Sequence, residues 1–280
     1  MRYNCVADAA ARRVRDTLQL GDLAAAGDHY TEAEQHFARA SRQIPRHFRR
    51  NSPQMMALLN SRGVLAKYIG RYASAHRFYR RALRIALRTL PPNDPEWATL
   101  YHNLAGIEYA CGHLARAERY ARKSVQLRKR ALGNRHLALV LDVAALAPIL
   151  QCRKKYGEAE RLYRWARYHI ARKLGLNHPE MATVLGNFAA NYHAQGNGRA
   201  AKELYKRALA ISLKTLGRNH PQTAVIQNNL AKLLLSSGRP EEAERLFIAS
   251  YGALRHRLRP EHPYLRRLRN NLMRLAETSD

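Results

Sequence analysis

The chain has few cysteines and no long apolar run, and each shortage argues against a class of protein. The three cysteines, Cys5, Cys111 and Cys152, form no CxxC pair and no even-numbered framework, so neither a disulfide scaffold nor a cysteine metal site is predicted. Reduced, buried thiols in a cytoplasmic protein are expected instead. No apolar run follows Met1, so we expect no secretory signal, and we expect no membrane span.

Acidic residues are also scarce. The sequence holds 21 Asp and Glu against 49 Lys and Arg, which gives a formal net charge of +28. A field this positive attracts anionic partners, namely acidic peptides, nucleic acid or an anionic membrane surface.

Motifs for catalysis are missing from the sequence as well. It contains no glycine-rich phosphate loop, no nucleophile elbow and no HExxH. Histidines recur every 42 residues, but adjacent ones should lie one repeat apart, too far to share a metal through bonds of about 2 Å. We interpret them as turn residues: His136, His178, His220 and His262. No enzyme, cofactor or metal site is therefore predicted.

What the sequence has in abundance is repetition with a period of 42 residues. One column holds Ser52, Asp94, His136, His178, His220 and His262, and a proline usually follows. Ser and Asp are good N-cap residues, and proline suits the first helical position. The column therefore predicts the start of a first helix, helix A, in each repeat.

Columns of small residues predict close helix packing. A column in helix A is always Gly or Ala, and two columns in a second helix, helix B, are Ala or Ser. An aromatic column in helix B is interrupted only by Ala121. Small residues at fixed offsets from bulky rings are what paired, stacked helices require. The helix A column is Gly21, Gly63, Ala105, Ala147, Ala189 and Ala231, and the aromatic column is Phe37, Tyr79, Tyr163, Tyr205 and Phe247.

Glycines between helices A and B suit the left-handed position that ends a helix. They are Gly70, Gly112, Gly196 and Gly238, whereas the fourth repeat has Lys154 in this place. The same repeat has Pro148 inside its helix A, where a kink is expected.

The columns resemble tetratricopeptide repeats, and the longer period resembles the kinesin light chain subtype. The matching segments are LGLNHPEMATVLGNFA, LGRNHPQTAVIQNNLA, GEAERLYRWA and AAKELYKRAL. The resemblance implies an all-α, right-handed superhelical solenoid and a protein-binding role. We predict one domain, 1–280, with six helix-turn-helix repeats at about 10–52, 53–94, 95–136, 137–178, 179–220 and 221–262. A capping helix is expected at 263–277.

The resemblance also implies that helix A lines a concave groove that binds short peptides with acidic flanks. An asparagine amide can hold a peptide backbone through both its donor and its acceptor, but it can equally hydrogen-bond a neighbouring helix, and both readings stay open. The groove residues predicted to bind an acidic peptide or protein are Lys67, Asn103, Tyr109, Asn187, His193, Asn229, Lys232, Arg267, Asn271 and Arg274.

Helix B suggests an alternative function. Its arginines recur in the same columns and predict continuous basic ridges, Arg77, Arg80, Arg88, Arg119, Arg122, Arg130, Arg161, Arg164 and Arg172. A nucleic acid could neutralise them, whereas a solvated face is the simpler reading of any single arginine. The leading hypothesis is a non-catalytic scaffold, and the alternative is a nucleic-acid-binding solenoid. Whether the array acts alone or as a subunit of a larger complex stays open.

Overall fold

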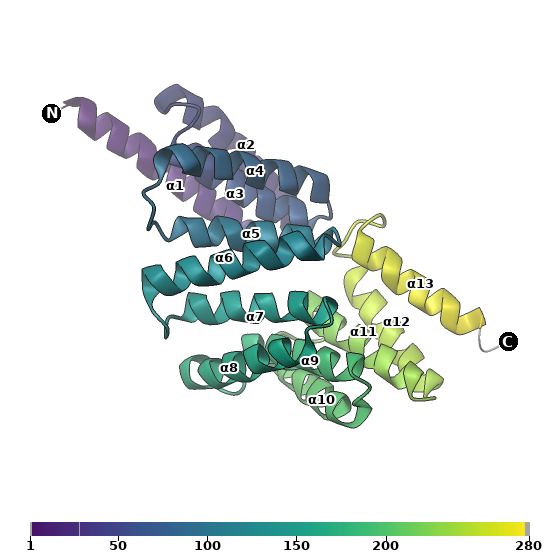
Figure 1. The fold of residues 1–280 in the computed structure, drawn as a ribbon. Helices are drawn as coiled ribbons and strands as arrows, with labels where there is room; N and C mark the ends of the chain where they lie inside the picture. The colour runs from purple at the N-terminus through teal and green to yellow at the C-terminus, as the bar shows by residue number, and fades with distance from the viewer. Residues whose placement is uncertain (1, 28, 278–280) are drawn as a thin grey trace. The chain divides into compact units, whose positions relative to one another are not determined.

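The computed structural model describes residues 2–27 and 29–277. In those residues it contains thirteen helices and no strand, so the predicted all-α class is confirmed. The helices form two compact units, one ending at Leu132 and the other beginning at Gly133 (Figure 1). The single domain predicted from the sequence stays a prediction.

The first unit is three helix pairs. Each A helix packs on the B helix that follows it, in the way that the repeat columns predict. The pairs are α1 (Arg2–Ala26) with α2 (Tyr30–His47), α3 (Pro53–Tyr68) with α4 (Tyr72–Thr89), and α5 (Glu96–Ala110) with α6 (Leu114–Leu132).

The second unit has three further pairs and a last helix. The pairs are α7 (Leu137–Cys152) with α8 (Tyr156–Leu174), α9 (Pro179–Ala194) with α10 (Gly198–Thr215), and α11 (Pro221–Ser236) with α12 (Pro240–Leu254). The last helix, α13 (Pro263–Glu277), packs on α12. It buries Leu265 and Leu268, while Arg266, Arg269 and Arg274 are exposed. Its role as a capping helix stays a prediction.

The junction histidines are helix caps. The Nδ1 atom of His178 accepts a hydrogen bond of 3.1 Å from the backbone N–H of Glu180, and His220 accepts the same bond from Gln222. His136 and His262 do the same for α7 and α13. A ring nitrogen thus takes the place of the Ser or Asp oxygen that usually satisfies a free N–H at a helix start.

The helix ends follow the predicted pattern. Gly196 adopts φ +79°, which a side chain disfavours, and Lys154 adopts φ +59° at the equivalent place. Lys154 therefore carries the strain that a glycine avoids. Helix α7 continues through Pro148 to Cys152.

In the first two repeats, helices A and B pack closely because a glycine in helix A leaves room for an aromatic ring of helix B. A Cβ added to Gly21 would lie 2.5 Å from Cε1 of Phe37, and a Cβ on Gly63 would meet the Tyr79 ring even more closely. Both rings are buried. The small residue in helix A therefore marks where the aromatic ring of helix B lies flat against the backbone.

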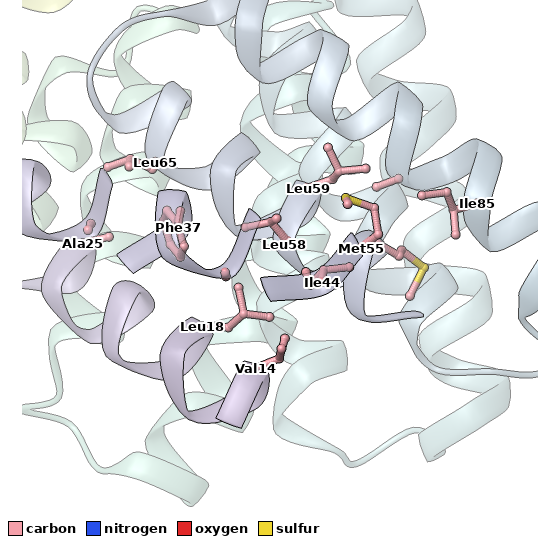
Figure 2. Packing of buried hydrophobic residues seen from close by; sticks show 14 of the residues in the cluster. Val14, Leu18, Ala25, Phe37, Ile44, Met55, Leu58, Leu59, Leu65 and Ile85 are labelled. Atoms are coloured by element: carbon pink, nitrogen blue, oxygen red, sulfur yellow. The ribbon is translucent and has the colours of Figure 1, made fainter. Parts of the chain in front are cut away.

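The core of the first unit continues from one helix pair to the next. Figure 2 shows Val14 and Leu18 of α1 facing Phe37 and Ile44 of α2, and the same cluster includes Leu58 of α3. Each pair thus buries its apolar surface against its neighbour, as stacked repeats must.

The cysteines differ from the prediction. Cys111 and Cys152 are exposed, not buried, because Cys152 is the last residue of α7 and Cys111 follows α5 directly, so both lie beyond the last buried residue of their helix. The side chain of Cys5 lies outside the described residues. Helix α2 runs to His47 and includes Pro45.

We expect Gly63→Ala to lower the free energy of unfolding by about 1–3 kcal/mol, because the added methyl group overpacks the buried Tyr79 ring. Gly157→Ala is the control, since its Cβ would meet nothing within 4 Å, and it should be neutral or stabilise by about 0.5 kcal/mol. Urea unfolding measures both. Equal stability of the Gly63 variant and the wild type would show that the contact is not tight.

Candidate functional site: the A face of each unit

Successive A helices are joined by hydrogen bonds between their polar side chains. In the first unit the Ser61 hydroxyl donates to Asp22 Oδ2 over 3.1 Å, and Asn103 Nδ2 donates to Asn60 Oδ1 over 2.7 Å. In the second unit Gln222 donates to Thr183 over 2.6 Å. We call the surface that these helices form in each unit its A face.

The A face of the first unit is hollowed between α1 and α3. The depression has a volume of about 430 Å³ and is lined by Arg15, Leu18, Gln19, Asp22, Leu23, Ala57 and Ser61. Burial raises the pKa of Asp22, although the hydrogen bond from Ser61 lowers it in part. Two of the lining residues, Gln19 and Ser61, stand in the same helix A column as Asn103 and Asn187.

Lys67 is the predicted groove residue with the most unusual surroundings. Its side chain is half-buried, and its Nζ lies 5.5 Å from the centre of the Tyr68 ring and beside Gly106. Burial lowers the pKa of this ammonium, and among the described residues Lys67 forms no ion pair. Tyr109, one repeat further, is 38% exposed. Lys67 is thus a partly desolvated cation that a carboxylate could neutralise.

The sequence left open whether the asparagines bind a peptide or hydrogen-bond a neighbouring helix, and the structure differs from one asparagine to the next. Asn103 and Asn271 donate to the neighbouring A helix, the second to Asn228 Oδ1 over 3.0 Å. Asn229 accepts from Asn228 over 3.2 Å, and its own amide N–H groups have no partner in the described chain. Asn187 is half-buried and makes no hydrogen bond with the described residues. Two of the amides are therefore structural and two remain open to a ligand.

The predicted bases of the second unit influence one another. Burial, followed by the charge of Arg267, lowers the pKa of Lys232, and burial, followed by Lys232, lowers the pKa of His193. His193 Nε2 lies 3.2 Å from Ser236 Oγ on the next A helix. Arg267 is exposed and packs over the Tyr264 ring at 4.9 Å. Arg274 is exposed one repeat after Lys232. The A face of the second unit is therefore a row of bases.

The nine predicted helix B arginines are exposed, and four of them contact a carboxylate or a tyrosine. Glu118 Oε1 accepts from Arg122 over 2.8 Å, and Glu160 Oε1 accepts from Arg164 over 2.7 Å. Arg172 donates to Tyr168, and Arg119 packs over Tyr120 at 5.6 Å. For Arg130 and Arg161, and for Arg77, Arg80 and Arg88 on α4, the structure gives no partner carboxylate in the described residues.

Sequence reasoning missed a buried carboxylate in the first unit. The Glu108 side chain is buried, and it lies 3.0 Å from His76, 2.7 Å from His113 and 3.2 Å from Arg116. Its charge contributes to raising the pKa of Cys111. The signal was present in the sequence, since the same column of helix A is otherwise Ala, Leu or Tyr: Ala24, Ala66, Leu150, Tyr192 and Leu234.

The helix pairs and their A faces define a helical-repeat solenoid, a class built to present a surface. Models of the tetratricopeptide repeat match residues 55–96, 97–138, 137–214 and 180–256. The chain belongs to the tetratricopeptide repeat family, and its repeats are of the kinesin light chain-like kind. A comparison with curated proteins finds no match.

Three solved structures share the fold. The nearly identical TPR-like repeats of a Podosopora anserina protein assigned as a kinesin light chain are 23% identical, with a TM-score of 0.56, covering 74% of this chain and 97% of that one. BtubC (BKLC) of P. vanneervenii is 20% identical, with a TM-score of 0.55 and coverages of 88% and 89%. NprR in complex with its cognate peptide NprX is 15% identical, with a TM-score of 0.72 and coverages of 95% and 72%.

Within the part of the chain that the structure describes, every helix is too short or too polar to cross a membrane.

We expect Lys67→Met to raise the free energy of unfolding at neutral pH by roughly 1 kcal/mol, because it removes a desolvated charge that lacks a partner. The folded-state pKa is lowered, so folding disfavours the protonated form. The gain should therefore be full at neutral pH and shrink as pH rises from the folded-state pKa towards the ordinary value of 10.5.

The matched control is Lys123→Met on α6, where the lysine is exposed and the change should stay within about 0.5 kcal/mol. Urea unfolding between neutral and alkaline pH measures both variants. A Lys67 variant that is less stable than the wild type would mean that the ammonium has a favourable partner.

Proposed function

We propose that the protein is a non-catalytic scaffold that binds an acidic peptide, or an acidic segment of a protein, on the A face of its second unit. The proposal rests on one observation, which is that asparagine amides and basic side chains lie together on this face. The amide of Asn187 and the amide N–H groups of Asn229 have no partner in the described residues. Lys232, Arg267 and Arg274 lie on α11 and α13 without an ion pair in those residues.

The chemistry of a peptide backbone matches the two amides. A peptide unit offers one N–H and one C=O, and an asparagine side chain accepts from the first and donates to the second. Asn229 and Lys232 are one turn apart on α11, so they lie on one side of the helix. A backbone held by Asn229 would therefore bring an acidic side chain within reach of the lysine.

Burial explains why an acidic residue is the expected neighbour. Lys232 is half-buried and its pKa is lowered, which shows that the free protein keeps this ammonium at a cost. A carboxylate would offset that cost through a charge-assisted hydrogen bond. Arg267 and Arg274 add positive charge that steers an acidic ligand towards the same face.

The related solenoid NprR has been solved with its cognate peptide. That structure supports peptide binding as a use of this fold, and the side chains of this chain favour an acidic ligand. The cytoplasmic location stays a prediction of the sequence.

Selection of random twelve-residue peptides on the immobilised protein tests the proposal. We expect the selected peptides to be enriched in Asp and Glu. The double variant Asn187→Ala/Asn229→Ala should bind an enriched peptide about tenfold more weakly or worse, since each lost neutral hydrogen bond is worth about 0.5–1.5 kcal/mol. Isothermal titration calorimetry measures the affinity.

Asn219→Ala, in the exposed turn before α11, is the control and should bind as the wild type does. Urea unfolding should show all three proteins folded under the binding conditions, with a lower midpoint for the double variant alone, because Asn229→Ala removes the acceptor of the buried Asn228 amide. A selected pool without acidic enrichment, or equal affinity of the double variant and the wild type, would contradict the proposal.

A further inference from the structure

Helix α4 differs from every other B helix in its charge. Of the six B helices in the described chain it is the one that contains no Asp or Glu. It carries five arginines, all of them exposed: Arg77, Arg80, Arg81, Arg84 and Arg88. We call these five residues the α4 arginine face.

The arginines of this face have no carboxylate partner among the described residues. Arg77 donates to the Ser74 hydroxyl over 3.1 Å. The equivalents of Arg80 in later repeats, Arg122 and Arg164, are each held by a glutamate four residues earlier on their own helix. In α4 that earlier position is His76, and its ring is directed to the buried Glu108 instead. One substitution in the repeat thus leaves the charge of α4 uncompensated.

The spacing of the face suits a linear polyanion. Arg77, Arg81, Arg84 and Arg88 lie at i, i+4, i+7 and i+11, so they share one side of the helix and span about 16 Å at a rise of 1.5 Å per residue. Together with His76 and Phe78, four of the five arginines line a shallow hollow of about 540 Å³. Residues three or four positions apart on a helix have Cβ atoms about 5–6 Å apart, which is less than the Debye length of about 8 Å at physiological salt, so the arginines repel one another in the free protein.

We propose that the α4 arginine face binds the phosphate backbone of a nucleic acid. Guanidinium groups bind phosphate oxygens in pairs through parallel N–H donors. A span of about 16 Å matches about five phosphates of one duplex strand, which are spaced 3.4 Å along the axis. The site lies on helix B and uses none of the A-face residues of the proposed peptide site.

The composition of the face favours a nucleic acid over a protein partner. Single arginines are common at protein interfaces, but interfaces with nucleic acid are much more positively charged than those with protein. Here the hollow itself is lined by four arginines. Arg122 on α6 and Arg164 on α8 are paired with a glutamate on their own helix, whereas α4 has no acidic residue at all, so we place the binding surface on α4.

The test is fluorescence anisotropy of labelled probes with the nuclease-treated full chain between 50 and 300 mM salt. The probes are a 20-base-pair duplex DNA and a 20-nucleotide single-stranded RNA. The variant Arg77→Gln/Arg81→Gln/Arg84→Gln/Arg88→Gln should bind at least about tenfold more weakly at the lowest salt. Its plot of log affinity against log salt should be shallower by about 0.9 for each lost duplex contact or about 0.7 for each single-strand contact. The probe whose affinity falls more in the variant, duplex DNA or single-stranded RNA, identifies the kind of nucleic acid that the face binds.

The matched control is Arg161→Gln/Arg164→Gln/Arg167→Gln/Arg172→Gln on α8, which removes the same net charge and should retain the affinity and the salt slope. An equal loss of affinity in this control would overturn the proposal, because binding would then depend on the total charge of the protein and not on α4. Binding of polyglutamate or of phosphatidylserine vesicles that exceeds nucleic-acid binding and depends on α4 would also overturn it, as would absence of nucleic-acid binding at 150 mM salt. The α4 variant should still bind the selected acidic peptide with unchanged affinity, which distinguishes the α4 site from the proposed peptide site on the A face.

Discussion

Each repeat depends on one close contact, in which a Gly or Ala of helix A faces a buried residue of helix B. Where the residue is glycine, as at Gly21 and Gly63, the ring lies where a Cβ would be. Phe37, Tyr79, Tyr163, Tyr205 and Phe247 are fully buried in this way. Burial of a ring of this size contributes about 2–3 kcal/mol, which fixes the pairing of the helices against the entropy of the chain.

That contact also decides which surface remains for function. One side of helix A is covered by its own helix B, and another side by the next repeat. The remaining side is free to change without loss of the fold, and the same column there holds Lys67, Tyr109 and His193. The polar bonds between A helices tie some of these residues into the structure, as at Asn103, while an equivalent residue such as Asn187 is left open.

The excess of positive charge has two different meanings in this molecule. Arg122 on α6 and Arg164 on α8 are each neutralised by a glutamate one turn earlier, a pairing worth only a few tenths of a kcal/mol at the surface. On α4 the glutamate is replaced by His76, which is drawn to Glu108, and the charge is left for a partner. The net charge of +28 alone therefore does not indicate where an anionic partner binds, because the positions of the acidic residues decide which basic side chains remain unpaired.

The sequence by itself determined the helices, their pairing and their stops, because a 42-residue period repeats the same local rules: a cap, a small residue, a ring and a glycine. It predicted the small column at Gly63 and the exceptional residue at Lys154 correctly, since each is a property of the repeat. The exposure of Cys111 and Cys152, the burial of Glu108 and the division of the asparagines depended on the tertiary structure. The partners of Glu108 and of the asparagines in the adjacent repeat lie 32 to 43 positions away, and the local sequence gives no signal of which side chain comes within hydrogen-bonding distance.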